Sequence, residues 1–67
     1  MYKVGDKVKV IGGDDRKAYN ILTRKLETVT HNGFVTTVTL VEDDVVWIKD
    51  MNGGSVWIEM CNIEPTN

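Results

Sequence analysis

The stretch VVWIKDMNGGSVWIEM, residues 45–60, decides the fold of this chain. Two runs rich in valine, isoleucine and tryptophan flank an Asn-Gly-Gly, which is typical of a β-hairpin. A three-residue loop at 51–53, with Gly53 in a left-handed conformation, predicts that Trp47 lies opposite Trp57. In that register one face of the hairpin is apolar and consists of Val46, Ile48, Val56, Ile58 and Met60.

The other face of this hairpin is polar but holds both tryptophans of the chain. Its members are Val45, Trp47, Lys49, Ser55, Trp57 and Glu59. A two-residue turn at 52–53 would instead pair Trp47 with Ile58 inside and leave Trp57 outside, because a one-residue shift moves every side chain to the other face. We favour the first register because it separates aliphatic from charged side chains more completely. Outward-facing tryptophans are candidates for contact with a partner.

The rest of the chain predicts further strands and one helical segment. Residues 4–11 alternate, with Val8 and Val10 inward and lysines outward, as in a half-buried strand. Residues 15–26 change to helical spacing and predict a short helix or helical turn that covers one end of the core, with Asp14 or Asp15 as its N-cap.

The segment after this predicted helix is rich in β-branched residues. Residues 27–31 predict a short strand, and residues 34–41 predict a longer one after the turn at Asn32 and Gly33. Ile63 should return to the core before Pro65 ends the pairing.

The length of 67 residues allows one domain, spanning 1–67, with a modest core. A large active-site cavity is not expected in a single copy, and no catalytic set is evident, so we do not expect an enzyme. The single cysteine, Cys61, and the single histidine, His31, exclude an internal disulfide and the usual zinc ligand set. We therefore expect no cofactor or metal.

We expect a cytoplasmic protein. A reducing compartment is the default for a lone cysteine. The N-terminal residues alternate between charged and apolar, unlike a signal peptide. No apolar run approaches membrane-spanning length, so no membrane partner is expected.

The charges are unevenly distributed along the chain, whose net charge is −2. Seven of the eight basic residues lie within 1–33, whereas six of the ten acidic residues lie within 34–67. The basic residues are candidates for phosphate contacts. They are Lys3, Lys7, Lys9, Arg16, Lys17, Arg24 and Lys25. The acidic pI of about 5.1 nevertheless argues against nucleic acid as the main partner.

Several short motifs resemble those of the SH3-like small barrels. The opening YKVGDKVKV (2–10), the strand GFVTTV (33–38), the hairpin with an aromatic strand and the closing NIEP (62–65) follow the layout of that superfamily. The resemblance implies an all-β fold, a five- or six-stranded SH3-like barrel with a short helical insertion in the loop after strand 1. The architecture hosts many unrelated functions, so it implies little about activity.

Three branches of this superfamily bear on function. The opening strand is similar to that of KOW-type modules, which implies contact with RNA or RNA polymerase. The Ala-Leu-Tyr-Asp-Tyr run and the proline-groove tyrosines of eukaryotic SH3 domains are absent. The strand VWIE (56–59) resembles the catalytic strand of type II dihydrofolate reductases, but Trp57 and Glu59 stand where that family has Gln and Tyr, which argues against the activity.

The sequence thus predicts a non-catalytic module that binds a protein partner through Trp47, Trp57, Lys49 and Glu59. The alternative is a KOW-like module that binds nucleic acid, or a ribosome or transcription complex, through the basic first strand and loop. The oligomeric state stays open, with a homodimer among the alternatives.

Overall fold

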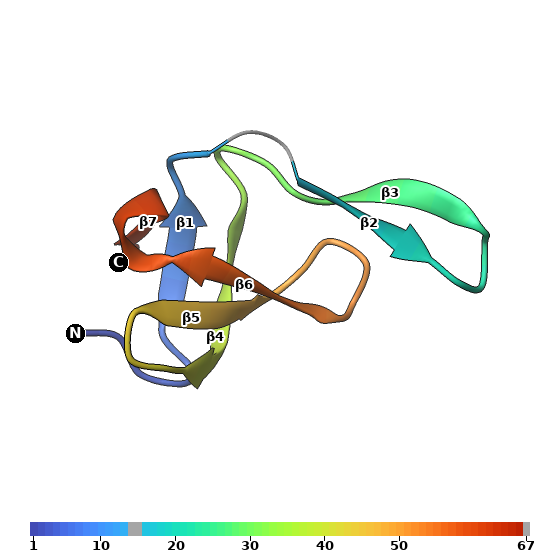
Figure 1. Cartoon of the computed structure of the whole chain (residues 1–67). Helices are drawn as coiled ribbons and strands as arrows, with labels where there is room; N and C mark the ends of the chain where they lie inside the picture. Colours follow the sequence, from blue (N-terminus) through green and yellow to red (C-terminus); the bar gives the residue numbers. More distant parts are fainter. Residues whose placement is uncertain (14–15, 67) are drawn as a thin grey trace.

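The computed structural model describes residues 1–13 and 16–66, and these form an all-β structure (Figure 1). It contains seven strands and one short 3-10 turn. The elements are β1 (Lys7–Val10), β2 (Arg16–Asn20), β3 (Lys25–Thr30), β4 (Val35–Val41), β5 (Val45–Lys49), β6 (Ser55–Glu59), η1 (Met60–Asn62) and β7 (Ile63–Pro65).

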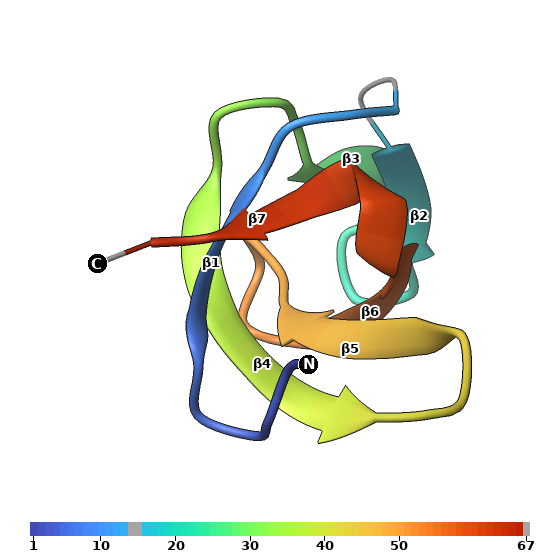
Figure 2. The ribbon, with the colours of Figure 1, turned by 90° about the vertical axis from the view of Figure 1, so that its left-hand side faces the viewer.

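The strands form two separate antiparallel sheets. Five of them form a sheet in the order β6-β5-β4-β1-β7, and β2 pairs only with β3. The β2–β3 ribbon projects to one side of the larger sheet (Figure 1). The long strand β4 curves around the molecule (Figure 2). A register shift between Val38 and Leu40 accompanies this curvature. The strand pairs with β1 through residues 35–37 and with β5 through residues 38–41, on both sides of the shift.

The core lies on the concave side of the five-stranded sheet. It contains seven buried aliphatic side chains, Val8, Val10, Val38, Val46, Ile48, Ile58 and Ile63. The alternation predicted for the first strand is confirmed, because the valines of β1 are buried while its lysines are exposed. The predicted return of the chain at Ile63 is confirmed as well.

The β5–β6 hairpin has the register that the three-residue loop predicts. Trp47 pairs with Trp57, and Ile48 pairs with Val56. The amide of Asp50 donates to the carbonyl of Gly54 across 2.9 Å, and Gly53 has a φ of 89°. The alternative register with Trp47 opposite Ile58 is therefore wrong.

The left-handed backbone at Gly53 can be tested by substitution. A Cβ at this position would contact nothing within 4 Å, so a substitution should act only through the left-handed backbone. We expect Gly53→Ala to lower the free energy of unfolding by about 1 kcal/mol, and Gly53→Asn by less, because asparagine tolerates this conformation. Urea unfolding followed by circular dichroism measures both. Equal losses for the two variants would contradict this explanation.

The helix predicted over residues 15–26 is not present in the described part of that segment. Residues 16–20 and 25–30 are strands, joined by a turn in which Arg24 has a φ of 61°. The side chain of Asn20 accepts hydrogen bonds from the amides of Leu22 and Thr23, which favours a turn over a helix. The large apolar residues of this segment are exposed rather than packed on the core. The predicted caps, Asp14 and Asp15, lie outside the described residues.

The predicted closed barrel of five or six strands is also wrong. Among the described residues, β6 and β7 remain at the two edges of the five-stranded sheet and do not pair with each other. The turn η1 separates them, and the β2–β3 ribbon forms a sheet of its own instead of completing the ladder. The loop of the β5–β6 hairpin contacts that ribbon locally, where the amide of Met51 donates to the carbonyl of Val29 across 2.9 Å and the side-chain amide of Asn52 donates to the carbonyl of Thr28 across 3.4 Å.

Candidate functional site

The four residues predicted to bind a partner lie on one face of the β5–β6 hairpin. The side chains alternate along each strand, so Trp47 and Lys49 share a face, and Trp57 and Glu59 lie beside them on β6. Trp57 is 45% exposed. Trp47 is half-buried, and its indole N–H donates to the carboxylate of Glu42. The two rings therefore differ in the surface that they offer to a partner.

Arg16 joins this face from the β2–β3 ribbon. Its guanidinium carbon lies 4.5 Å from the centroid of the Trp57 ring, a cation–π arrangement. The same guanidinium donates a hydrogen bond to the backbone carbonyl of Trp57. Because β6 is an edge strand, no neighbouring strand supplies an N–H for this carbonyl to accept, and Arg16 supplies the donor instead. The two contacts hold the indole and the positive charge together.

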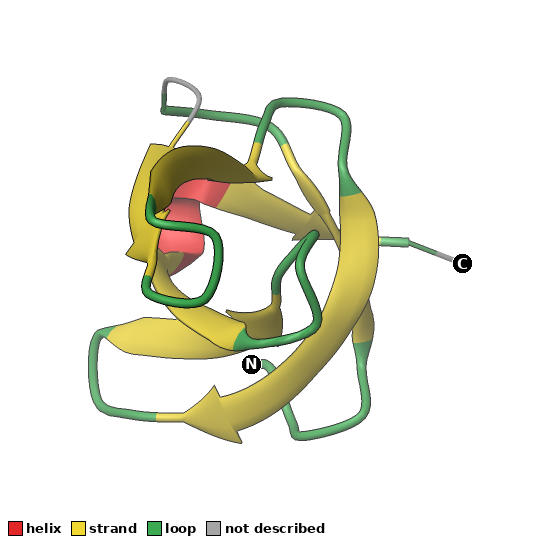
Figure 3. Ribbon diagram, turned by 90° about the vertical axis from the view of Figure 1, so that its right-hand side faces the viewer, coloured by secondary structure: helices red, strands yellow, loops and turns green. Residues whose placement is uncertain are grey.

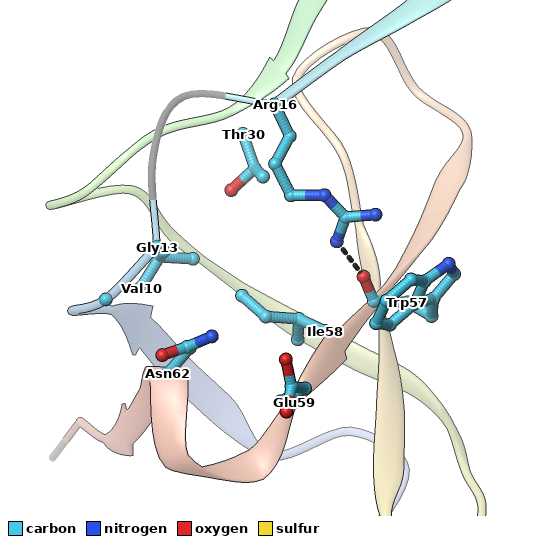
Figure 4. A pocket seen from close by; sticks show the side chains of 9 residues that line it. Val10, Gly13, Arg16, Thr30, Trp57, Ile58, Glu59 and Asn62 are labelled. Atoms are coloured by element: carbon cyan, nitrogen blue, oxygen red, sulfur yellow. Dashed lines mark hydrogen bonds between the residues drawn. The ribbon is translucent and has the colours of Figure 1, made fainter.

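A pocket of about 310 Å³ opens beside this pair (Figure 4). Arg16 borders one side of the pocket, Glu59 and Asn62 border the other, and Ile58 lies between them. The remaining lining comes from Val10, Gly12, Gly13, Thr30 and Trp57. A ligand here would meet aliphatic and indole surface together with one cationic and one anionic side chain.

The hydroxyl of Thr30 is the most unusual group in this pocket. The residue is only 1% exposed, and its Oγ1 has no hydrogen-bond partner among the described residues. A buried polar atom without a partner costs free energy, so native proteins rarely keep one without a reason. Thr30 lines the pocket, but its hydroxyl oxygen is itself buried, so a polar group of a ligand would reach it only if the lining moves.

Thr30→Val tests this cost, since valine has the same shape without the hydroxyl. We expect the free energy of unfolding to rise by about 1 kcal/mol or more. The matched control is Thr36→Val, because the Thr36 hydroxyl donates to the carbonyl of Lys49 across 2.6 Å. That change should instead lower stability, by about 1 kcal/mol. Chemical denaturation of both variants gives the comparison, and a loss of stability in Thr30→Val would show that the hydroxyl is satisfied in solution.

The basic residues do not gather in one patch. Lys7 and Lys9 lie on the outer face of β1, whereas Lys17, Arg24 and Lys25 lie along the β2–β3 ribbon (Figure 1). Lys9 lies opposite Glu64 in the register of β1 and β7, so a residue of opposite charge stands beside it. Of the seven basic candidates, Arg16 alone lines the pocket beside Trp57.

Part of this pocket does not follow from the sequence. The sequence predicts Arg16 only as a phosphate contact, and nothing in it marks Thr30 or Asn62 as a site residue. Arg16 and Asn62, which border the pocket on opposite sides, come from β2 and η1. Their proximity depends on the ribbon and the 3-10 turn, and no periodicity in the sequence indicates it.

No protein-family model, curated protein or solved structure matches this chain. Within residues 1–13 and 16–66, no three histidine, cysteine or carboxylate side chains are grouped as metal ligands. The same part of the chain contains no helix that is long and apolar enough to cross a membrane. Cys61 is a free, exposed thiol.

Proposed function

We propose that this protein is a small non-catalytic module that binds a segment of a partner protein on the outer face of the β5–β6 hairpin. The observation that carries the proposal is the exposed indole of Trp57 held under Arg16 at the rim of a pocket. Tryptophan and arginine are both among the residue types enriched at the energetic centres of protein interfaces. The half-buried Trp47 and the charged Lys49 and Glu59 extend the same face.

The lining of the pocket favours one kind of partner segment over others. Its opposing Arg16 and Glu59 favour a segment that carries groups of both signs, or backbone amides and carbonyls, over a uniformly charged one. If the lining moves, a polar side chain that enters the pocket would give Thr30 Oγ1 the hydrogen-bond partner that it lacks among the described residues.

We limit the proposed resemblance to SH3-like small barrels to the order of the elements, without a closed barrel. The elements that support it are an opening strand, a projecting ribbon, the meander β4–β5–β6 and a short last strand paired with the first. This succession places the ribbon beside β6 and thereby brings Arg16 to Trp57.

Capture of partners by the tagged protein from its native host tests the proposal. We expect capture to survive nuclease and to persist at about 0.5 M salt, where contacts that depend on phosphate are strongly weakened. It should be lost in the Trp47→Ala/Trp57→Ala double variant while the fold, monitored by circular dichroism, persists. Capture that disappears with nuclease and falls steeply with salt would favour the KOW-like nucleic-acid module. Unfolding of the double variant would assign the indoles to the core.

A further inference from the structure

The tip of the β2–β3 ribbon exposes more apolar surface than any other described turn of the molecule. Ile21 is 78% exposed and Leu22 is 90% exposed. Tyr19 and Leu26 pair across the two strands just below the tip and are also exposed. Figure 3 shows the tip nearest the viewer, at the end of the ribbon that projects from the larger sheet. Contiguous exposed apolar side chains of this kind mark a contact surface.

The tip is held in shape by its own hydrogen bonds. The carbonyl of Asn20 accepts from the amide of Arg24 across 2.7 Å, and its side-chain oxygen accepts from the amide of Leu22 across 2.9 Å. The carboxylate of Glu27 accepts from Asn20 and Thr23, at 2.8 and 3.1 Å. These backbone groups therefore have partners before any docking, so burying the tip would not leave them unsatisfied.

The charge that the tip presents is positive. Arg24 and Lys25 are exposed at its end, and Lys17 is exposed further along the ribbon. The single acidic residue described in the ribbon, Glu27, is half-buried and engaged in the hydrogen bonds within the turn. A complementary surface would combine an apolar hollow with carboxylates around it.

The protein carries such a surface itself, at its other end. A hollow of about 470 Å³ is lined by Met1, Val41 and Met60 together with Glu42 and Asp43. The N-terminus and the β4–β5 turn that form it lie at the opposite end of the molecule from the tip of the ribbon (Figure 1). Figure 2, viewed from that end, shows both of them in front and the ribbon behind. The longest dimension of the molecule is 36 Å.

We propose that the tip of one copy docks into the hollow of a second copy. Ile21 and Leu22 enter between the apolar side chains, and Arg24 and Lys25 lie against Glu42 and Asp43. Because the tip and the hollow are at opposite ends of the molecule, the contact is head-to-tail. It can therefore continue from copy to copy in a row or ring. The contact area is small, which makes the association weak and dependent on concentration.

Sedimentation equilibrium of the full chain tests the contact from about 10 μM to about 1 mM, the range in which small interfaces associate. The average mass of the native protein should rise above the 7.6 kDa of one copy, and the rise should diminish in high salt. A tip variant, Leu22→Asp, and a hollow variant, Asp43→Lys, should each remain monomeric. Mixed in equal amounts they should form a dimer and nothing larger, since one retains an intact hollow and the other an intact tip.

Two control variants test whether the loss of association is specific to the tip and the hollow. Val35→Asp also puts a carboxylate at an exposed apolar position, on β4, and should associate like the native protein. Trp57→Ala should do so too, which separates this contact from the partner-binding face. The proposal is overturned if the native protein is monomeric at about 1 mM, where even weak contacts are populated. It is also overturned if the mixed variants stay monomeric.

Discussion

Ile48→Ala should leave most of the protein unfolded at room temperature. Ile48 is completely buried at the centre of the core, between the other strands of the larger sheet. Truncating a buried isoleucine removes transfer free energy and leaves a cavity, at a cost of about 2–5 kcal/mol. The single core of a domain below about 70–80 residues rarely supplies more than about 3–5 kcal/mol of free energy of unfolding. The expected loss is therefore comparable to the whole stability of the fold.

The same substitution at Ile21 is the matched control for Ile48. Ile21 is exposed at the tip of the ribbon, so Ile21→Ala should change the free energy of unfolding by less than about 0.5 kcal/mol. Circular dichroism and urea unfolding of the two variants give the comparison directly. Similar losses at the two positions would show that the tip is packed in solution, or that the core is not centred on Ile48.

The contrast between these two isoleucines shows how far the sequence predicts the fold. Ile48 lies in a strand whose register is determined by the adjacent turn, so both its face and its burial can be predicted. Ile21 lies in a segment whose apolar spacing also fits a helix. A helix there would need a core surface to cover, but the aliphatic residues of the larger sheet already fill the core among themselves. The segment forms a ribbon instead, supported by the side chain of Asn20.

The candidate site was predictable only where it lies within one hairpin. The shared face of Trp47 and Trp57 follows from pairing between neighbouring strands. Arg16 reaches Trp57 across 41 positions of sequence, and Thr30 becomes buried through the packing of β3 rather than through any pattern of its own. Long-range proximity of this kind depends on the path of the ribbon, and the predicted helix over residues 15–26 does not give that path.

Trp57→Ala should reduce affinity for the protein partner by about 30-fold, which corresponds to about 2 kcal/mol. The indole offers the largest exposed apolar area of the β5–β6 face, and burial of an exposed tryptophan dominates many interfaces. Its removal also frees the guanidinium of Arg16 from the ring on which it rests. Stability should fall by only about 1 kcal/mol, the size of a cross-strand pair and an exposed cation–π contact.

Three further variants separate the role of the indole in binding from a role in folding. Val35→Ala removes another exposed apolar side chain, on β4, and should leave affinity unchanged. Trp57→Phe retains a ring beneath Arg16 and should recover part of the affinity. Trp47→Ala should cost more stability than Trp57→Ala, because Trp47 is half-buried and its N–H is bonded to Glu42. Titration calorimetry with the captured partner, alongside urea unfolding, measures both quantities, and an affinity of Trp57→Ala equal to that of Val35→Ala would exclude the indole from the binding face.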